Sequence, residues 1–284
     1  MANNNSPVIG VEKRWRAQYN NRFKALKGRV NRFFSSANEV ESPEFVELFQ
    51  SWFDDNINQL LLMGGVATAI TIWQNEFIEQ AFLRGIVTSN AALTNAGILL
   101  PQVNPAPLKL LQQKSFSDLK GIVGETEAQV YRALVTGIEN GESKTTLAKA
   151  VNNRIDKIGR TRSHVLVNTR TTESYNTAEI TQAESAAKAS GAEIKMEWFT
   201  EGDSRVRTTH ALRNRKFYSA TAAQRLIGEP GCRCHLKLKV EKGTAKEQEE
   251  RAAIRKRELK ISRQAREERR FFESIGPRPI NPTT

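Results

Sequence analysis

The sequence predicts a mostly α-helical α+β protein: an N-terminal helical region, a C-terminal helical domain with a small antiparallel β-hairpin, and then a long exposed helix. Three observations predict it. Apolar residues recur at three- and four-residue steps through most of the chain up to Ser190, which is the helical period. After Gly191 the pattern changes to the alternation of a strand. Beyond residue 241 charged residues predominate, as in solvent-exposed helices.

Composition sets the outer limits of the function. With 284 residues and 39% hydrophobic content the chain can bury a core, and its net charge of +12 favours polyanionic partners such as nucleic acid or anionic lipid. We expect no membrane span, because no apolar run reaches about 18 residues. The start of the chain lacks a secretory pattern, so we expect synthesis in a reducing cytoplasm and no disulfide between Cys232 and Cys234.

The first predicted helix, at 11–34, is basic and amphipathic. Its aromatic and aliphatic residues recur at helical spacing among eight lysines and arginines and one acid. Such a helix either packs on a core with a solvated basic face or binds DNA, a membrane surface or an acidic partner. The spacing leaves these alternatives open.

Two acidic helices are expected next. Ser42 followed by Pro43 is typical of a helix N-terminus. The apolar stripe of this helix is expected at Phe45, Leu48, Phe49, Trp52 and Phe53. A second helix is predicted at about 65–82. The pair forms either a helical subdomain or an acidic face for another protein.

The proline-rich stretch at 100–107 predicts a boundary, so we divide the chain into 1–105, 106–240 and 241–284. Helices are then expected at 119–140, 143–158 and 162–190, the last closed by Gly191. The apolar side of that last helix is expected at Val165, Leu166, Thr169, Tyr175, Ala178 and Ile180.

Alternating residues at 193–199 and 234–240 predict two strands that pair with each other. The segment 205–231 between them is expected to be a long functional loop with a short helix at 221–227. A charged helix at 242–272 and an extended, proline-containing tail at 276–284 are expected to end the chain.

Most of the unusual chemistry lies in this hairpin region. Four side chains, Cys232, Cys234, His210 and His235, are candidate ligands for a tetrahedral structural zinc, with Asp203 able to replace one histidine. The Cys-x-Cys spacing differs from common zinc knuckles. In the alternative, the cysteines pack in the core and His210 hydrogen-bonds Asp203 or a backbone carbonyl. No cofactor is certain from the sequence.

Two motifs in this region carry a family resemblance. The first runs from Trp198 through Asp203 and Arg207 to His210, and the second runs from Gly228 to Cys234 and includes Arg233. Together with the upstream pattern at 168–176 they resemble the phage head-morphogenesis family related to the F protein of phage Mu and to portal-associated minor capsid proteins. The resemblance covers about residues 110–240. The family often has a glycine shortly after the histidine, where this chain has Arg213-Asn-Arg-Lys216, which puts the conformation of the loop in doubt.

The resemblance implies a structural virion protein without catalytic residues, made in the host cytoplasm and present in a few copies near the portal vertex of a tailed phage. It implies a role in head assembly or DNA ejection. The implied partner is the portal protein oligomer, with major capsid or scaffolding protein as further candidates.

Basic clusters add non-specific double-stranded DNA as a candidate partner. The candidate phosphate-binding side chains are Arg205, Arg207, Arg213, Arg215, Lys216, Arg160 and Arg162. The alternative is a solvated basic surface.

Three competing functions follow from the same residues. A metal-dependent nuclease would use His210, His235 and Asp203, with Asn214 orienting the site. An ADP-ribosyl-transferring toxin would use Arg170 but lacks an evident Glu-x-Glu motif after the strands. A cationic membrane-surface protein would use the helix at 11–34.

Overall fold

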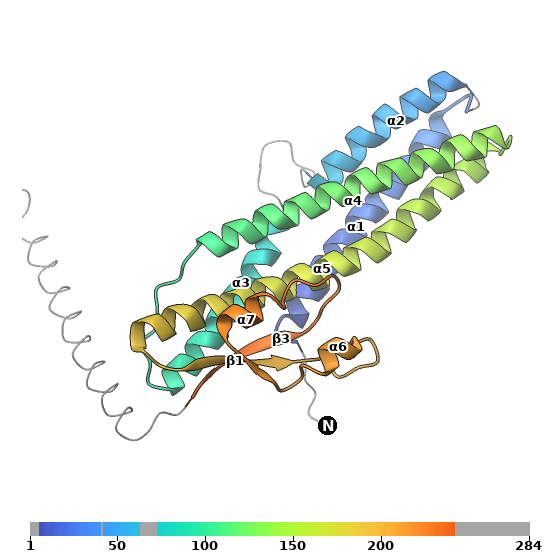
Figure 1. Ribbon diagram of the computed structural model, residues 1–284. Helices are drawn as coiled ribbons and strands as arrows, with labels where there is room; N and C mark the ends of the chain where they lie inside the picture. The colour runs from blue at the N-terminus through green and yellow to red at the C-terminus, as the bar shows by residue number, and fades with distance from the viewer. Residues whose placement is uncertain (1–5, 41, 63–72, 242–284) are drawn as a thin grey trace, which may run out of the picture.

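The computed structural model describes residues 6–40, 42–62 and 73–241, and its long helices run side by side with a small sheet against one end (Figure 1). The three longest helices are α1 (Ile9–Ser36), α4 (Ala106–Glu139) and α5 (Lys144–Ser190). Helix α2 (Pro43–Ile57) leads into a π-helical turn, η1 (Asn58–Leu62), and α3 (Asn75–Asn95) packs against α5. The mostly helical α+β class predicted from the sequence is confirmed.

The sheet has three antiparallel strands in the order β2-β1-β3, so β3 lies at one edge. Strand β1 (Ile194–Phe199) pairs with β3 (His235–Val240) from Ile194–Val240 to Phe199–His235, which confirms the predicted hairpin pairing. Strand β2 (Phe217–Tyr218) was not predicted, because two residues are too few to show alternation. Short helices α6 (Thr208–Ala211) and α7 (Ala220–Gln224) lie in the same connection, so the helix predicted at 221–227 is shorter than expected.

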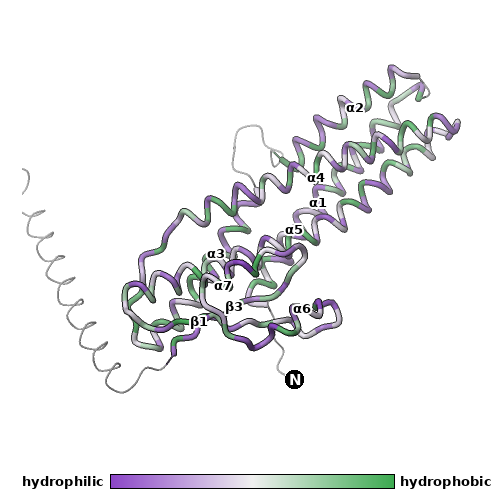
Figure 2. Tube along the Cα trace, in the orientation of Figure 1, coloured by the Kyte–Doolittle hydropathy of each residue, from purple (hydrophilic) through white to green (hydrophobic). Residues whose placement is uncertain are grey.

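Two hydrophobic clusters hold these layers together, and the hydrophobic positions lie mainly between the helices (Figure 2). The larger cluster joins α1 through α5. The smaller one joins the sheet to the C-terminal half of α5 and the end of α3. Helix α5 contributes to both, so it connects the helical bundle to the sheet.

Helix α1 is a core helix whose cations are engaged by neighbouring helices. Its aromatic side, including Trp15, Tyr19 and Phe23, is buried. On the basic side, Arg16 donates to Asn168 (2.7 Å) and Lys27 pairs with Asp156 (2.7 Å). This arrangement favours the core-facing interpretation of the basic pattern over a membrane-surface helix.

No helix in the described ranges is long and apolar enough to span a bilayer.

Helix α2 begins as predicted, because Ser42 Oγ accepts a hydrogen bond from the Phe45 amide (3.2 Å). Leu48 was wrongly assigned to its apolar stripe: it is 61% exposed, and Ile57 is buried instead. The helix expected at 65–82 is described only from Asn75, and it continues to Asn95. Residues 65–72 of that prediction lie outside the described residues.

The prediction of two helices between 143 and 190 was wrong, since α5 is one helix of 47 residues. The helix continues through Gly159, which packs directly on Phe23. Glycine is needed at this position because an added Cβ would lie 2.8 Å from the ring. Ser143 caps its start and Gly191, with φ 65°, ends it, as expected. Val165, expected on the apolar side, is 42% exposed. Helix α4 begins at Ala106 rather than Leu119, with Pro107 in its first turn.

The boundary placed at residue 105 falls in the irregular connection between α3 and α4, and helices from both sides of it share the larger hydrophobic cluster. The division into domains therefore stays a prediction. The predictions for the charged helix at 242–272 and the tail at 276–284 fall outside the described residues.

We expect Gly85→Ala to destabilise the bundle by about 1–3 kcal/mol, because the new Cβ would lie 2.4 Å from the Tyr175 carbonyl oxygen and 2.7 Å from Ala178 Cβ. Urea denaturation measures the change. The matched control is Gly121→Ala in α4, where nothing lies within 4 Å of the added methyl, and this change should stabilise by about 0.5–1 kcal/mol. Equal midpoints for the two variants would contradict the close packing of α3 on α5.

Candidate functional site

The middle of α5 is unusual because polar residues are buried around its whole circumference. The buried polar side chains are Asn168, Thr169, Arg170, Thr171, Thr172, Glu173, Ser174, Asn176, Thr177, Glu179 and Gln182. Helices α1, α3 and α4 pack on this helix, and so do β1, β3 and α7. Buried polar groups are stable only when they are hydrogen-bonded, so the partners of these side chains indicate what the helix holds in place.

Side chains of α5 complete the hydrogen bonding of the edge strand β3. Asn176 accepts from the Leu236 amide (2.8 Å) and donates to the Cys234 carbonyl (3.0 Å). Glu179 accepts from the Leu238 amide (2.9 Å) and from the Tyr175 hydroxyl (2.9 Å). An edge strand otherwise leaves such backbone groups unpaired. The side chains of α5 therefore supply the hydrogen bonds that a neighbouring strand would supply. Burial raises the pKa of Glu179 to about 7, against the opposing effect of these hydrogen bonds.

The same helix seats the Gly228–Cys234 motif. Thr169 Oγ1 accepts from the Gly231 amide (2.7 Å), and the Thr172 hydroxyl donates to the Cys232 carbonyl (2.9 Å). Gly228 has φ 82°, and a Cβ there would lie 2.9 Å from a Glu173 carboxylate oxygen. Glycine is therefore required at 228, both for its backbone conformation and for its close approach to Glu173.

Glu173 is in turn fixed by cations. Lys114 of α4 pairs with one oxygen (2.7 Å), and Arg170 pairs with the other. Arg170 also pairs with Asp118 (2.5 Å), so these four charged groups connect α4, α5 and the glycine of the motif. The buried charges of Arg170 and Glu173 are tolerated because each has a partner of opposite sign.

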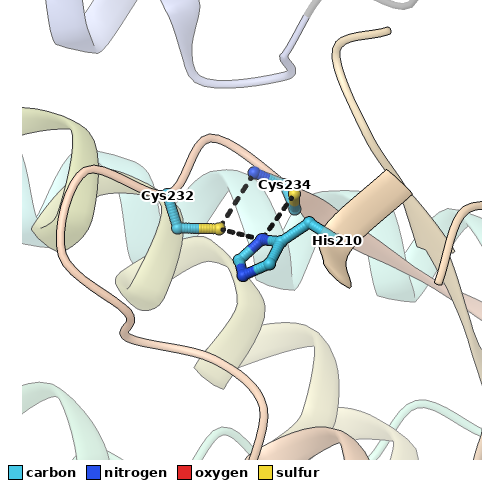
Figure 3. A group of neighbouring side chains, drawn as sticks. All are labelled: His210, Cys232 and Cys234. Carbon is cyan, nitrogen blue, oxygen red and sulfur yellow. Dashed lines mark hydrogen bonds between the residues drawn. The ribbon is translucent and has the colours of Figure 1, made fainter. Parts of the chain in front are cut away.

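The core of the site is a buried group formed by His210, Cys232 and Cys234 (Figure 3). His210 Nδ1 lies 3.4 Å from Cys234 Sγ and 3.5 Å from Cys232 Sγ, and the Cys234 amide lies 3.4 Å from Cys232 Sγ. The three residues are 2%, 7% and 4% exposed, and both cysteines are free thiols. Within the described ranges, no other group of at least three His, Cys, Asp or Glu side chains has its ligand atoms this close together.

Glu229 holds the outer side of this group. Its carboxylate lies 2.8 Å from His210 Nε2, 3.1 Å from Arg213 and 3.3 Å from Arg207. Partial burial alone would raise the pKa of Glu229, but the hydrogen bonds from His210 and Arg213 lower it below its ordinary value. The Glu229 carboxylate contacts Nε2, so Nδ1 is the imidazole nitrogen that faces the two sulfur atoms.

The two thiols differ in acidity. Hydrogen bonds from Cys234, together with the nearby imidazole, lower the pKa of Cys232 to about 6. The site therefore favours one thiolate near neutral pH, and thiolates are the form in which cysteine binds metal ions.

His235, a candidate ligand from the sequence, does not join this group. Its ring stacks on Phe199 with centroids 5.2 Å apart, and burial lowers its pKa to about 4. The physical reason is the alternation of the strand that begins there: Cys234 and His235 are adjacent and point to different sides.

Asp203 is also separate from the cluster, because it forms a two-point ion pair with Arg233 (2.6 and 2.9 Å). Hydrogen bonds from Arg233 and Arg205 lower its pKa, so Asp203 stays ionised. The expected hydrogen bond between His210 and Asp203 is replaced by the one to Glu229. The structure thus does not bring together His210, His235 and Asp203, the set that the nuclease hypothesis needs.

The candidate DNA-binding residues divide into two groups. In the loop, Arg205, Arg207, Arg213 and Arg215 pair with Asp203, Glu229, Glu229 and Glu197 respectively. Among the described residues, Lys216 of the loop and Arg160 and Arg162 of α5 have no ion-pair partner. These carboxylates offset only part of the positive charge of the loop, because Arg207 and Arg213 share Glu229.

The departure from the family pattern after His210 has a structural counterpart. Arg215 has φ 64°, the left-handed conformation that glycine adopts most easily. Its amide donates to the Trp198 carbonyl (2.7 Å), and its guanidinium pairs with Glu197 (3.2 Å). These contacts offset a backbone cost of about 1–2 kcal/mol.

The two sequence motifs therefore contact each other directly. Asp203 forms an ion pair with Arg233, Arg207 forms one with Glu229, and His210 contacts both cysteines. Trp198 is 1% exposed and packs edge-on against His210, with centroids 5.9 Å apart. The protein is thus an α-helical bundle with a small antiparallel sheet, whose connecting loop is fixed by ion pairs and a buried His-Cys-Cys cluster.

The comparison with known families agrees with this arrangement. Residues 128–238 match the family described as Phage Mu protein F like protein, which covers less than half of the chain but includes both motifs. Residues 128–238 are therefore similar to the Phage Mu protein F like family. Searches of the curated proteins and of the solved structures find no match.

Sequence reasoning missed three acids of the site. Glu229 was part of a motif but received no role, and Glu179 lies just beyond the upstream pattern at 168–176. Glu12 of α1 is 1% exposed, and burial raises its pKa to about 7 although it pairs with Arg16 (3.1 Å). The signal available for Glu12 was its position as the single acid of a basic helix.

We expect Asn176→Ala to destabilise the protein by about 2–4 kcal/mol, because it leaves the Leu236 amide and the Cys234 carbonyl buried without partners. Chemical denaturation measures the loss, and hydrogen exchange of the Leu236 amide should become faster. Thr181→Ala on the same helix is the control, since its hydroxyl bonds only the Thr177 carbonyl. Unchanged exchange at Leu236 would contradict the role of α5 as the partner of β3.

Proposed function

We propose that this protein is a minor head protein at the portal vertex, where it binds the portal oligomer, contacts DNA non-specifically and acts in head assembly or DNA ejection. The family match over 128–238 is the observation that carries the proposal. Major capsid or scaffolding protein is a second candidate partner. The clasped hairpin serves as a rigid brace in this proposal, and no residue is assigned a catalytic role.

Support for DNA contact comes from exposed cations of α5, of which Arg162 lies about 160° around the helix axis from Arg160. Lys149, Arg154, Lys157, Arg160 and Arg162 are all exposed, and the one acid among them, Asp156, is paired with Lys27. Lys149, Lys157 and Arg160 lie within about 80° of one another around the helix axis. The cations extend along roughly 20 Å of the helix, enough to meet several phosphates.

An open cavity of about 710 Å³ adjoins this surface, lined in part by Arg132, Arg154 and Lys157. Its cations add to the positive potential of the α5 surface. We therefore place the DNA contact on α5 between 149 and 162 rather than on the loop 205–216, whose arginines already have carboxylate partners.

Portal binding predicts co-purification. When the chain is co-expressed with the portal protein of its own phage, it should elute with the portal oligomer and remain attached at about 0.5 M salt, where screening removes plain electrostatic adsorption. The salt wash is the control, because a net charge of +12 favours adsorption. Portal oligomers that elute without the chain at both low and high salt would contradict portal attachment.

DNA contact through α5 predicts a salt-dependent affinity for duplex DNA that does not vary with sequence. We expect Arg160→Gln with Arg162→Gln to weaken binding to a duplex of about 30 base pairs and to reduce the slope of log K against log salt by about 2. Fluorescence anisotropy at several salt concentrations measures both.

The matched control removes the same charge from the loop. Arg205→Gln with Arg215→Gln takes away two cations that are already paired with Asp203 and Glu197, so the slope should change little. If the loop variant loses the slope and the α5 variant keeps it, the contact lies on the loop instead.

A further inference from the structure

We propose that His210, Cys232 and Cys234 bind one divalent zinc ion, which braces the two motifs against each other. The inference does not depend on where the protein sits in the virion. It rests on the convergence of three ligand atoms, on the contact of Glu229 with the other ring nitrogen of His210, and on the backbone contacts that fix the two cysteines.

A single S–H···N hydrogen bond would require only one sulfur atom close to His210 Nδ1, whereas both lie close to it. A neutral imidazole nitrogen has one lone pair, so it accepts one S–H donor well. Here both sulfur atoms lie at nearly equal distances from Nδ1, 3.4 and 3.5 Å. Tetrahedral zinc with bonds of about 2.05 Å to nitrogen and 2.3 Å to sulfur would hold these atoms about 3.6 Å apart, so the ion fits with a small outward adjustment.

The surroundings of the ligands match those of a metal site. Glu229 accepts the Nε2 proton of His210, and a carboxylate in this position orients a ligating imidazole and raises its basicity. The Cys234 amide donates toward Cys232 Sγ and so stabilises a thiolate there. Two thiolates would neutralise the charge of the ion in a pocket that is otherwise closed to solvent.

The ligands are held in place before any ion binds. Thr172 and Asn176 of α5 fix the carbonyl groups of Cys232 and Cys234, which are the same two residues that supply the sulfur atoms. Trp198 packs on the His210 ring from the other side. Little ordering entropy would be lost on binding, which favours affinity.

The fourth coordination position faces a small cavity of about 70 Å³, lined by His210, both cysteines, and Glu201, Val206 and Arg207 among others. This space is large enough for a water molecule. We therefore assign three protein ligands and one water, because Glu201, the one carboxylate in the lining, is not among the side chains whose ligand atoms converge.

The experiment uses the full chain. Protein produced in zinc-supplemented medium should contain about one zinc per chain by mass spectrometry of the metal, and Co²⁺ added to the apo-protein should give sulfur-to-cobalt charge-transfer bands and the visible bands of tetrahedral cobalt. Cys232→Ser, Cys234→Ser and His210→Asn should each lower the zinc content at least tenfold. Glu229→Gln should weaken zinc affinity about 10-fold or more.

His164→Gln is the matched control, because it removes a histidine outside the cluster and should leave one zinc per chain. The wild-type Co²⁺ spectrum keeps the test independent of whether the cysteine variants fold. A folded wild-type chain that binds neither Zn²⁺ nor Co²⁺ overturns the proposal. Equal zinc content in wild type and His210→Asn overturns the assignment of His210.

Discussion

Hydrogen bonds from the buried polar side chains of α5 to strand β3 and the loop before it are the constraint on which the rest of the site depends. Asn176 and Glu179 pair with the amides of Leu236 and Leu238, and Thr169, Asn176 and Thr172 pair with backbone groups between Gly231 and Cys234. A helix normally turns its polar residues to water. Here they are enclosed by other helices on one side and the sheet on the other, where leaving them unpaired would cost about 1–3 kcal/mol each.

This constraint fixes the second motif and, through it, the first. Once Cys232 and Cys234 are seated, His210 is positioned between their sulfur atoms and Glu229, and Asp203 reaches Arg233. The loop that carries these residues has little regular structure of its own, with two very short helices and a two-residue strand. Its order therefore comes from charge pairs and from the buried cluster rather than from local propensity.

The distribution of charge shows how strongly tertiary contacts change the meaning of a sequence. The arginines between 205 and 215 stand without an acid among them in the chain, yet each is paired with a carboxylate: Arg205 with the nearby Asp203, and the others with Glu229 or Glu197. Among the described residues the cations of α5 between 149 and 162 form no ion pair, although Glu125 and Glu142 line the same cavity as Arg154 and Lys157. We therefore propose the polyanion-binding surface on α5 rather than on the loop.

The sequence by itself determined the class of the fold, the hairpin strands with their pairing, the caps at Ser42, Ser143 and Gly191, and the family, because each depends on local periodicity or on residues close together in the chain. Only the tertiary structure decided that α5 is unbroken at Gly159, that His210 pairs with Glu229 instead of Asp203, and that His235 stands apart from the cysteines. Those outcomes depend on packing against Phe23, on acids from distant segments and on the direction in which a strand leaves its turn. Sequence spacing does not encode such long-range contacts, and so it grouped His235 and Asp203 with His210 and the two cysteines although the fold separates them.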